Sequence, residues 1–364
     1  MEVALVHDML VKLGGAERVL KALADMFPNA PIYTLLYDES QVGRVFPKSR
    51  VRTSPLQKYP GFIRNRRRYL LPKMPKAVES FDLSDYDLVI SSNTAFAHGI
   101  ITNSDTKHLC YCHSPMRYAW DWTHQYMKEQ RAGLLKRVAI RHILKNIRTW
   151  DYYAADRADH YIANSENVRR RIQKYYRQDA SVLYPPVDVE RFKVTPEHQK
   201  YFLIVSTISP YKNIELAVNL FNKVRKKLVI IGEGSDRNRL MQIAGPHIDF
   251  LGFKPDEVVR EYLQNCRALV FPGEEDFGIT PVEAMACGEL VLAYKKGGVM
   301  ESVIPGKTGE FFKESTIESM ENGLARLLVN EAKYDPQQIR QQAEEFAQSN
   351  FEKGMEQIIE KVLS

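Results

Sequence analysis

Short apolar runs alternate with amphipathic segments along most of this chain. The runs EVALVHD, APIYTLLY, DLVISSN, KHLCYCH and DHYIANS have the length and apolar content of buried strands, and a second series follows with YFLIVST, KLVIIGE, IDFLGF, ALVFPG and LVLAY. Helical periodicity separates many of them, at residues 16–27, 133–158, 213–223, 236–244, 256–266 and 281–287. Strands that alternate with helices predict an α/β fold with parallel, doubly wound sheets.

The two series of strands predict two Rossmann-like domains. A chain of 364 residues is long for one domain, and the stretch LYPPVDVERFKVTPEHQK breaks the periodicity with prolines and polar residues. We therefore expect an N-terminal domain at 1–184 and a C-terminal domain at 185–345. Residues 336–363 are predicted to be helical, and the helix at 346–364 is expected to join the first domain.

Composition and charge narrow the class of protein. Hydrophobic residues make up 44% and charged residues 26%, which excludes a disordered chain. The net charge of +6 favours acidic partners, such as a phosphorylated substrate or an anionic membrane. Nucleic acid is not expected as a partner, because no recognition motif accompanies the positive charge. We expect no leader peptide and no membrane-spanning run, so a membrane would be met from its surface.

The cysteine content favours a reducing cytoplasm. Cys110, Cys112, Cys266 and Cys287 are too few for a disulfide-stabilised fold. Cys110 and Cys112 alternate along one predicted strand and share a face, with His113 beside them. No further Cys or His cluster completes a zinc site, and we expect neither a metal nor another cofactor.

The stretch FPGEEDFGITPVEAMACG holds the most informative polar residues. Glu275 and Glu283 lie eight positions apart around Gly278, where a predicted strand turns into a helix. Carboxylates in this position can accept hydrogen bonds from sugar hydroxyls, and the N–H groups of a helix start can bind a diphosphate. Either glutamate alone fits a solvated helix start. The whole phrase, followed by KKGGVMESV, favours a site that grips both ends of a nucleotide sugar.

Parallel sheets bind ligands at the carboxyl ends of their strands. In the first domain these ends carry His7, Gly14, Gly15 and His113. In the second domain they carry Glu275 and the segments 206–212, 232–234 and 252–254. If the two domains face each other, all these ends line one cleft. Either histidine can instead be a buried structural residue that hydrogen-bonds a neighbour. For His113 we favour a functional role over this alternative, and for His7 the two interpretations are equally supported.

Eight motifs in order resemble the retaining glycosyltransferases of family 4, which have the GT-B fold. They span nearly the whole chain and read HDMLVKLGGAERV, CYCHSPMRYAWD, ANSENVRRRI, LYPPVD, IVSTISPYKN, VIIGEGSDRNRL, LGFKPDEV and EEDFGITPVEAMACG. The second motif is most similar to mannosyltransferases of bacterial O-antigen and exopolysaccharide assembly. The resemblance implies transfer of a hexose, such as mannose from GDP-mannose, to a saccharide or lipid-linked saccharide in polysaccharide or lipopolysaccharide biosynthesis.

The resemblance also implies roles for single residues. Lys212 would neutralise the departing diphosphate, Glu275 would hold ring hydroxyls of the donor sugar, and His113 would bind that sugar near the reacting carbon. Glu283 would bind the ribose hydroxyls. Further donor contacts, mostly through main-chain groups, are implied for Gly14, Gly15, Thr207, Gly232, Gly234, Gly252, Phe253, Lys254, Phe277, Gly278 and Ile279. The acceptor would attack from the face that the diphosphate leaves, without a metal.

One position departs from the family pattern. An arginine usually lies five residues before the lysine, and here that place is Thr207, which carries no charge. Losing such a contact would slow the reaction about a hundredfold or more, unless Arg237 or Arg239 compensates. Two functions therefore stay open. The chain is an active transferase, or it is a catalytically weakened relative that binds a nucleotide or saccharide as a partner subunit. A sugar-nucleotide epimerase of the same fold is disfavoured by the EEDFGITPVEA phrase.

Two basic segments with interleaved apolar residues predict association with an anionic membrane. Residues 61–73 contain Arg64, Arg66, Arg67, Arg68 and Lys73. Residues 133–150 contain the apolar Leu135, Val138, Ile140 and Ile143 beside Lys136, Arg137, Arg141 and Lys145. A solvated face is the alternative for each segment. We expect a cytoplasmic protein that is peripheral on the inner face of the plasma membrane.

Overall fold

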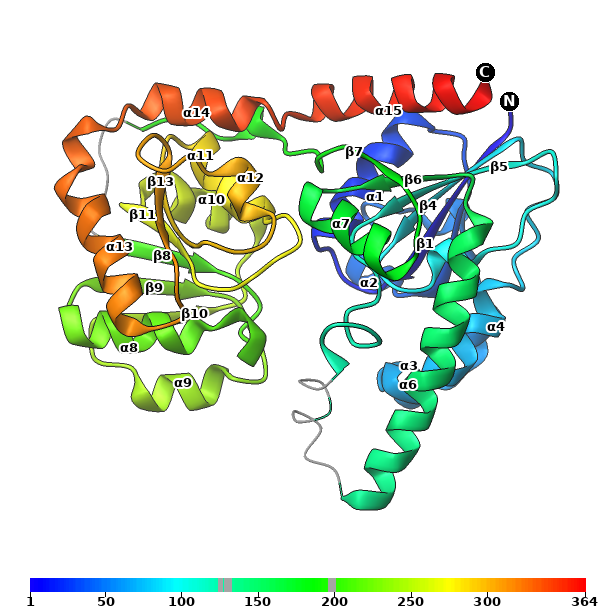
Figure 1. The fold of residues 1–364 in the computed structure, drawn as a ribbon, viewed down its shortest axis with the longest axis horizontal. Helices are drawn as coiled ribbons and strands as arrows, with labels where there is room; N and C mark the ends of the chain where they lie inside the picture. Colours follow the sequence, from blue (N-terminus) through cyan, green and yellow to red (C-terminus); the bar gives the residue numbers. More distant parts are fainter. Residues whose placement is uncertain (124–126, 128–132, 196–200) are drawn as a thin grey trace. The chain divides into compact units, whose positions relative to one another are not determined.

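The chain forms two compact units (Figure 1). The structure, a computed structural model, describes residues 1–123, 127, 133–195 and 201–364, with the side chains of 134–136 excepted. Unit 1 contains Met1–Tyr184 and Glu352–Ser364, and unit 2 contains Pro185–Phe351. The predicted contributions of Leu135 and Lys136 to a basic surface lie outside the described residues.

Unit 1 is built on a parallel sheet. Its strands are β1 (Val3–Leu10), β2 (Ile32–Tyr37), β3 (Val51–Thr53), β4 (Leu88–Asn93), β5 (Lys107–Cys112), β6 (His160–Ala163) and β7 (Ala180–Val182). They are ordered β3-β2-β1-β4-β5-β6-β7, and each neighbouring pair is parallel. The central strands are buried along nearly their whole length, as expected for a sheet that is covered on both faces.

Some helices of unit 1 begin where the sequence provides a cap. The Gly14 N–H donates to the Glu17 carboxylate at 2.9 Å at the start of the first helix, and the Ser165 hydroxyl accepts from Val168 N–H at 3.1 Å further along. The α-helices are α1 (Gly15–Met26), α2 (Glu39–Val42), α3 (Gly61–Arg64), α4 (Met74–Val78), α6 (Leu134–Ala154), α7 (Glu166–Tyr175) and α15 (Gln348–Leu363). Short 3₁₀ helices occupy Lys48–Arg50, Pro55–Lys58, Arg67–Tyr69, Leu71–Lys73, Ala97–Gly99 and Ala155–Arg157.

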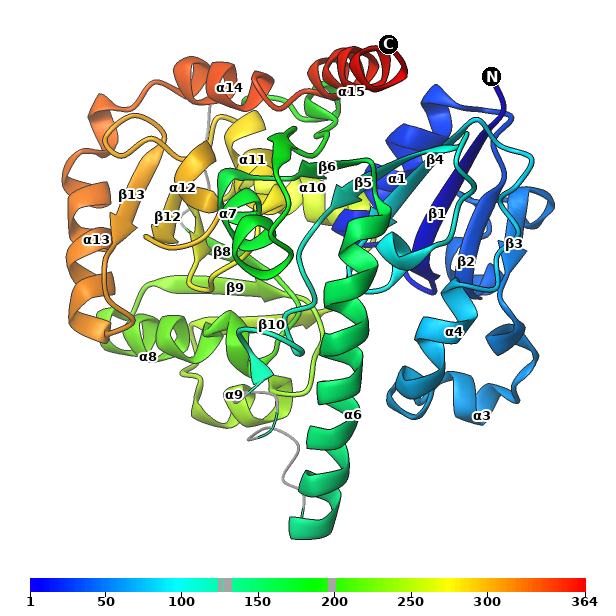
Figure 2. The same cartoon turned by 45° about the vertical axis from the view of Figure 1, so that its right-hand side comes forward.

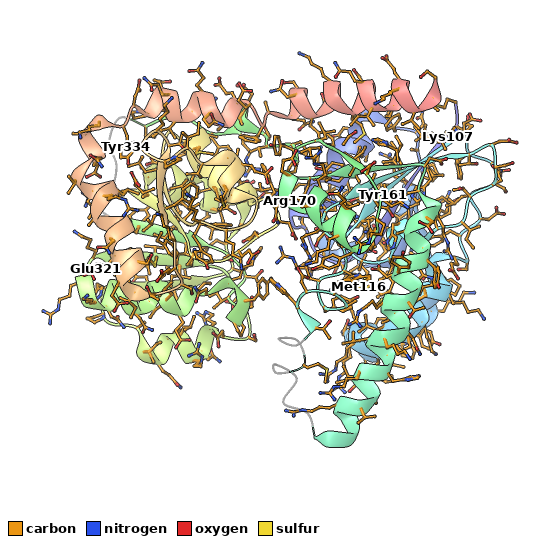
Figure 3. The ribbon with its side chains drawn as sticks, in the orientation of Figure 1. Lys107, Met116, Tyr161, Arg170, Glu321 and Tyr334 are labelled. Atoms are coloured by element: carbon orange, nitrogen blue, oxygen red, sulfur yellow. The ribbon has the colours of Figure 1, made fainter. Side chains whose placement is uncertain are left out.

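Helix α6 both packs on the core of unit 1 and extends beyond it. Leu144 and Ile147 are buried, whereas Val138, nearer the start of the helix, is 57% exposed. Figure 2 shows α6 running past the edge of the sheet on the same side as α3 and α4. Met116 and Tyr161, labelled in Figure 3, lie inside this unit and are fully or almost fully buried.

Unit 2 repeats the architecture with a second parallel sheet. Its strands are β8 (Tyr201–Val205), β9 (Lys227–Ile231), β10 (Ile248–Gly252), β11 (Ala268–Phe271), β12 (Leu290–Tyr294) and β13 (Gly309–Phe312), in the order β10-β9-β8-β11-β12-β13. The helices are α8 (Ile214–Val224), α9 (Arg237–Ile243), α10 (Asp256–Asn265), α11 (Ile279–Ala286), α12 (Val299–Ser302), α13 (Ile317–Val329) and α14 (Pro336–Glu344). The 3₁₀ helices are Val189–Arg191, Pro210–Lys212 and Glu331–Lys333. Two doubly wound parallel sheets confirm the predicted fold class.

The structure differs from the sequence prediction at the edges of the elements. Strands β3, β7 and β13 were not predicted, because each has only three or four residues and lies at a sheet edge. The helix predicted at 281–287 begins earlier, at Ile279, because Gly278 adopts a left-handed conformation with φ of 92° and ends the preceding turn. The segment predicted as helical at 336–363 is two helices, interrupted where Val187 N–H donates to the Phe346 carbonyl at 2.9 Å.

Candidate active site

The strand order of unit 2 places a ligand site beside β8. From β8 the chain moves outward through β9 to β10, and then returns to the other side of β8 with β11. The loops after β8 and β11 therefore diverge from each other at the carboxyl edge of the sheet. In open α/β sheets this point of divergence is where ligands bind.

Lys212 and Glu275 meet at this point. Lys212 ends the 3₁₀ helix Pro210–Lys212 after β8, Glu275 follows β11, and their side chains form an ion pair. The Lys212 side chain is 13% exposed and that of Glu275 is 28% exposed, so the pair is half-buried at the surface of the edge. The structure thus brings together two of the residues predicted to take part in the reaction. An ammonium group has three N–H donors, so Lys212 can hold Glu275 and still donate to an incoming anion.

The Lys212 loop is fixed by the residue that follows it. Asn213 adopts the left-handed conformation, with φ of 55°, and its amide donates to the Ser315 hydroxyl at 2.8 Å. A Cβ at Gly273 would lie 2.9 Å from the Lys212 carbonyl oxygen, so the two loops pack backbone against backbone. The turn at Asn213 and the close packing at Gly273 thus fix the backbone from which the Lys212 side chain extends.

The Glu275 loop is held in the same way from its other side. The Gly298 N–H donates to the Glu275 carbonyl at 3.0 Å. A Cβ at Gly297 would lie 2.3 Å from that oxygen, and one at Gly298 would lie 2.2 Å from the Asp276 carbonyl oxygen. These glycines of the KKGGVMESV stretch therefore permit a contact that no other residue allows. Lys296 adds a 3.0 Å ion pair to Glu274, which raises the pKa of the lysine.

Helix α11 starts at Ile279, four residues after Glu275. Phe277 packs its ring on Phe346 with centroids 5.4 Å apart, so its side chain belongs to the core and only its main chain is available at the edge. Glu283, on α11, is only 6% exposed. Ile279 begins the helix. The first turn of a helix presents N–H groups that the helix itself does not use, which suits an anion.

Glycines also line the loop after β9. A Cβ at Gly232 would lie 1.9 Å from the Ser206 carbonyl oxygen, and one at Gly234 would lie 2.0 Å from that of Ile208. Both are therefore held against the loop that carries Thr207, whose own side chain is exposed. The Gly232 N–H donates to the Gly252 carbonyl at 2.9 Å, which connects this loop to the end of β10.

The residues that follow β10 are more open. Phe253 has 77% of its surface exposed, and Lys254 is half-buried beside it. The segment predicted to pass the nucleotide base thus has its backbone tied to Gly232 through Gly252 and its aromatic side chain in solvent.

The two arginines considered as substitutes for the missing cation differ in their surroundings. Arg239 is clamped by two carboxylates, with its nitrogens 2.7–2.9 Å from oxygens of Asp236 and Glu215. This arrangement makes Arg239 a structural residue of α8 and α9. Arg237 lies 3.7 Å from Glu233, and its buried Nε has no hydrogen-bond partner among the described residues. Of the two arginines, Arg237 therefore has more donors left for a ligand.

In unit 1 a chain of polar contacts connects the glycine turn to His113. Glu17 accepts from Gly14 N–H, and its other carboxylate oxygen lies 3.6 Å from His7 Nε2. His7 Nδ1 lies 3.1 Å from both the carbonyl and the hydroxyl of Ser92, its register partner on β4. The Ser92 hydroxyl lies 2.8 Å from His113 Nε2. We name this series the Glu17–His113 relay.

The relay constrains the hydrogen on His7 and is compatible with one tautomer of His113. A carbonyl oxygen only accepts, so His7 Nδ1 carries the hydrogen that it donates to Ser92. The hydroxyl hydrogen of Ser92 is then free to be donated to His113 Nε2, and a neutral His113 presents Nδ1 as an N–H donor. Burial acts to raise the pKa of the Glu17 carboxyl, but hydrogen bonding to His7 and its charge outweigh burial and lower the pKa.

Several residues of this site were not predicted from the sequence. Arg171 on α7 donates to the Ser114 hydroxyl at 2.8 Å and to Asp121 at 3.0 Å, and Asn164 donates to the His113 carbonyl at 3.1 Å. These contacts hold the loop that carries His113. The signal for them was weak, because ANSENVRRRI reads first as a helix start. Ser92 carried a clearer signal as a polar residue at the end of a buried strand.

No cluster of three or more metal-ligating side chains occurs in the part of the chain that the structure describes. Cys110 and Cys112 lie together in the core cluster that contains Tyr161, and burial raises the pKa of the Cys110 thiol. Neither cysteine reaches solvent. Among the described helices, none is both long and apolar enough to cross a bilayer.

Comparison with known proteins identifies the class. The model of Glycosyltransferase Family 4 matches residues 13–191, and that of the Glycosyl transferases group 1 matches residues 187–346. Three curated relatives illustrate the match. An uncharacterised glycosyltransferase of Methanocaldococcus jannaschii is 27% identical over 52% of this chain and 56% of its own length. The α-1,3/1,6-mannosyltransferases ALG2 of Dictyostelium discoideum and Kluyveromyces lactis are 22% and 26% identical over 78% and 83% of this chain and 76% and 71% of their own lengths.

Solved structures share the fold over the full length. Sucrose-phosphate synthase of Thermosynechococcus elongatus superposes with a TM-score of 0.74 at 17% identity, with 99% of each chain covered. Anabaena HepE in complex with UDP-glucose gives 0.72 at 18% identity, with 99% of this chain and 100% of HepE covered. The fold and the matched models together define a GT-B glycosyltransferase. The first half of the chain matches family 4 and the second half matches group 1, so the chain is a GT4-like glycosyltransferase.

Replacing Ser92 with alanine tests the Glu17–His113 relay. The variant removes the hydroxyl that His7 and His113 share, so we expect about 1–3 kcal/mol less free energy of unfolding and a changed shift of the His113 ring nitrogens. Denaturant titration and nitrogen NMR measure the two effects. Ser91→Ala is the matched control, because the Ser91 hydroxyl lies 2.8 Å from the buried His108 instead. An equal change of the His113 signal in both variants would contradict the relay.

Proposed function

We propose that this protein transfers a hexose from a nucleoside diphosphate sugar to a saccharide or lipid-linked saccharide, with retention at the anomeric carbon and without a metal. The observation that carries the proposal is the Lys212–Glu275 pair at the divergence point of the unit 2 sheet, with Glu275 four residues before the start of α11. One cation, one carboxylate and a helix N-terminus provide partners for the two ends of such a donor.

In the proposed reaction the acceptor oxygen attacks the anomeric carbon on the face that the diphosphate leaves. The bond from that carbon to the diphosphate oxygen breaks, and the departing oxygen takes the proton of the acceptor hydroxyl. Lys212 stabilises the charge that grows on the diphosphate. Glu275 accepts from hydroxyls of the sugar, and the Nδ1–H of His113 donates to it. No separate catalytic base is required.

The relatives give the best starting point for the donor. Two curated relatives that the chain covers over 76% and 71% of their lengths are named mannosyltransferases, which favours mannose and GDP-mannose. A lipopolysaccharide 1,6-galactosyltransferase of Salmonella typhimurium is 26% identical over 51% of this chain and 59% of its own length, so UDP-galactose is the second donor to try.

Replacing Lys212 with methionine tests the proposed reaction. With GDP-mannose, UDP-galactose and UDP-glucose as donors, we expect the native protein to hydrolyse or transfer one of them. The variant should lose about 10²–10³ in kcat, the usual effect of removing one group that stabilises developing charge. Glu275→Gln should mainly raise KM for the donor sugar.

Lys227→Met is the matched control for the Lys212 variant. Lys227 forms an exposed ion pair with Asp249 at 2.6 Å in the same unit, at the start of β9 and so at the opposite edge of the sheet. Its loss should leave turnover unchanged. If the native protein bound nucleotide but turned over no donor, the alternative function of a partner subunit would replace the transferase.

Introducing the missing cation is the second test. Thr207→Arg should raise turnover about tenfold to a hundredfold, because a charge-assisted contact to the diphosphate would be gained. The Thr207 side chain is exposed, so the longer side chain has room. Arg237→Gln should lower turnover if Arg237 already fills this role. A drop in turnover in a folded Thr207→Arg protein would instead show that the phosphate site lacks nothing.

We propose that the protein is peripheral on an anionic membrane through unit 1. Phe62 is 71% exposed on α3, Arg66 and Arg68 are exposed next to it, and Arg137 and Arg141 are exposed on the part of α6 that extends past the sheet. Exposed aromatic and basic side chains favour anionic lipid, and each basic residue near the surface contributes about 1 kcal/mol. A lipid-linked acceptor would be reached without a transmembrane anchor.

Co-sedimentation with vesicles tests the membrane proposal. Arg66→Ser with Arg68→Ser should weaken binding to phosphatidylglycerol vesicles about thirtyfold. Binding of the native chain should fall with salt, because the Debye length shrinks from about 10 Å at 0.1 M to about 3 Å at 1 M. Arg67 is retained because its side chain also lines a cavity. The control is Lys313→Ser with Lys333→Ser, which removes two exposed charges from unit 2. Binding that ignores salt and lipid charge would refute the idea.

A further inference from the structure

A polar cavity of about 320 Å³ lies in unit 1. Val11, which follows β1, and Leu36 and Tyr37, which end β2, form part of its wall. The cavity therefore lies at the carboxyl edge of the sheet, the edge that also carries Gly14 and His113. The motifs of the sequence assign nothing to this position.

Two arginines in the cavity wall, Arg64 and Arg67, form no ion pair with the described residues. The Nε of Arg64 is buried and has no hydrogen-bond partner, and no carboxylate pairs with Arg64 or Arg67 among the described residues. An unsatisfied guanidinium in a partly buried place is costly unless an anion or water completes it. Arg67, which is exposed, adds a second guanidinium to the same wall, and the two together favour an anion with several acceptor oxygens.

The acidic residues of the cavity do not neutralise these arginines. Asp38 accepts from the backbone and hydroxyl of Ser40 at 3.1 and 2.6 Å, and Glu39 lies 3.9 Å from Lys48 Nζ. Neither carboxylate pairs with an arginine. The wall carries the three cations Lys48, Arg64 and Arg67 against these two carboxylates, so one positive charge is left for a ligand.

The wall beside the arginines is preformed. The Gln57 amide accepts from Tyr37 N–H at 3.0 Å and donates to the Tyr37 carbonyl at 2.8 Å, which closes the end of β2 as a further strand would. The Ser54 hydroxyl donates to the Leu35 carbonyl at 2.8 Å on the same strand. A rigid wall next to two planar guanidinium groups matches the geometry of phosphate oxygens.

We propose that this cavity binds a phosphoryl group of the acceptor, through Arg64 and Arg67. The proposal rests on the glycosyl transfer proposed above and names the substrate class of its acceptor side. Three strand spacings separate β2 from β5 in the order β2-β1-β4-β5, which is about 14 Å along the edge. An acceptor that reaches from the cavity to His113 is therefore an extended phosphorylated saccharide rather than a single sugar.

The phosphoryl group has two sources with the same chemistry, a soluble sugar phosphate or a lipid-linked diphosphate. The segment 61–73 is compatible with either source. Arg64 and Arg67 line the cavity, whereas Phe62 and Arg66 of the same segment are exposed. Inorganic pyrophosphate and farnesyl diphosphate serve as probes that separate the sources. Equal affinity for both indicates a soluble phosphate, and preference for the farnesyl compound indicates a lipid-linked one. Either result supports the site.

NMR of the arginine Nε–Hε groups in the full chain tests the proposal at the level of single residues. We expect the signals assigned to Arg64 and Arg67 to shift on titration with pyrophosphate. Arg64→Gln should weaken binding at this site about tenfold or more, because a charge-assisted fork is lost. The affinity of Arg64→Lys should lie between those of the native protein and of Arg64→Gln, because lysine keeps the charge but cannot donate two parallel hydrogen bonds. Arg66→Gln, two residues from Arg64 on the peptide chain but not part of the cavity wall, should bind as the native protein does.

The proposal is overturned if neither probe shifts the Arg64 and Arg67 signals, or if Arg66→Gln weakens binding as much as Arg64→Gln does. The outcome of this NMR titration is independent of the outcome of the donor-turnover assay. A native protein that turns over no nucleotide sugar but shows the pyrophosphate shifts loses its proposed function and keeps this anion site. A protein that turns over donor without the shifts keeps the function and loses the site.

Discussion

Parallel strand pairing is the constraint from which both candidate sites follow. Every strand of a parallel sheet delivers its following loop to one edge, so many loops must share a narrow strip. In unit 2 the strip is crowded enough that backbones touch, and Gly232, Gly234, Gly297 and Gly298 occupy places where a Cβ would meet a carbonyl oxygen at 1.9–2.3 Å. The interlocked loops hold Lys212 and Glu275 in register. The charged pair is thus a product of backbone packing rather than of the two side chains alone.

The two units hold their candidate functional side chains in place by different interactions. Unit 2 uses glycine contacts and an ion pair, which suits a ligand whose charge changes during reaction. Unit 1 uses a buried series of contacts, in which Glu17 lies 3.6 Å from His7 and hydrogen bonds connect His7 through Ser92 to His113. Hydrogen bonds between buried groups strengthen one another in a low dielectric and fix a single geometry. His113 is therefore oriented from beneath the sheet edge, by residues that a ligand never needs to touch.

The sequence predicted the periodic elements and the strand ends well, because apolar periodicity and the carboxyl-edge rule are local and topological properties. Lys212 and Glu275 were expected at one site, and the structure pairs them. Contacts that depend on register were not predictable. Ser92 faces His7 only because β1 and β4 are neighbours, although 85 residues separate them in the chain. Arg239 was a candidate cation, but Asp236 and Glu215 hold it in the structure, and Arg64 was predicted only as one charge of a basic segment that meets an anionic membrane.

The length of α6 separates the exposed charges at its start from a buried titratable group near its end. Arg137 lies fourteen residues before the buried Asp151 on this helix, which corresponds to about 21 Å along its axis. That distance exceeds two Debye lengths at physiological ionic strength, about 8 Å each. Burial raises the pKa of Asp151 to about 7, and it is held by Trp120 and Tyr176. The far end of the helix can therefore gain or lose charges with little effect on the protonation of Asp151 in the interior of unit 1.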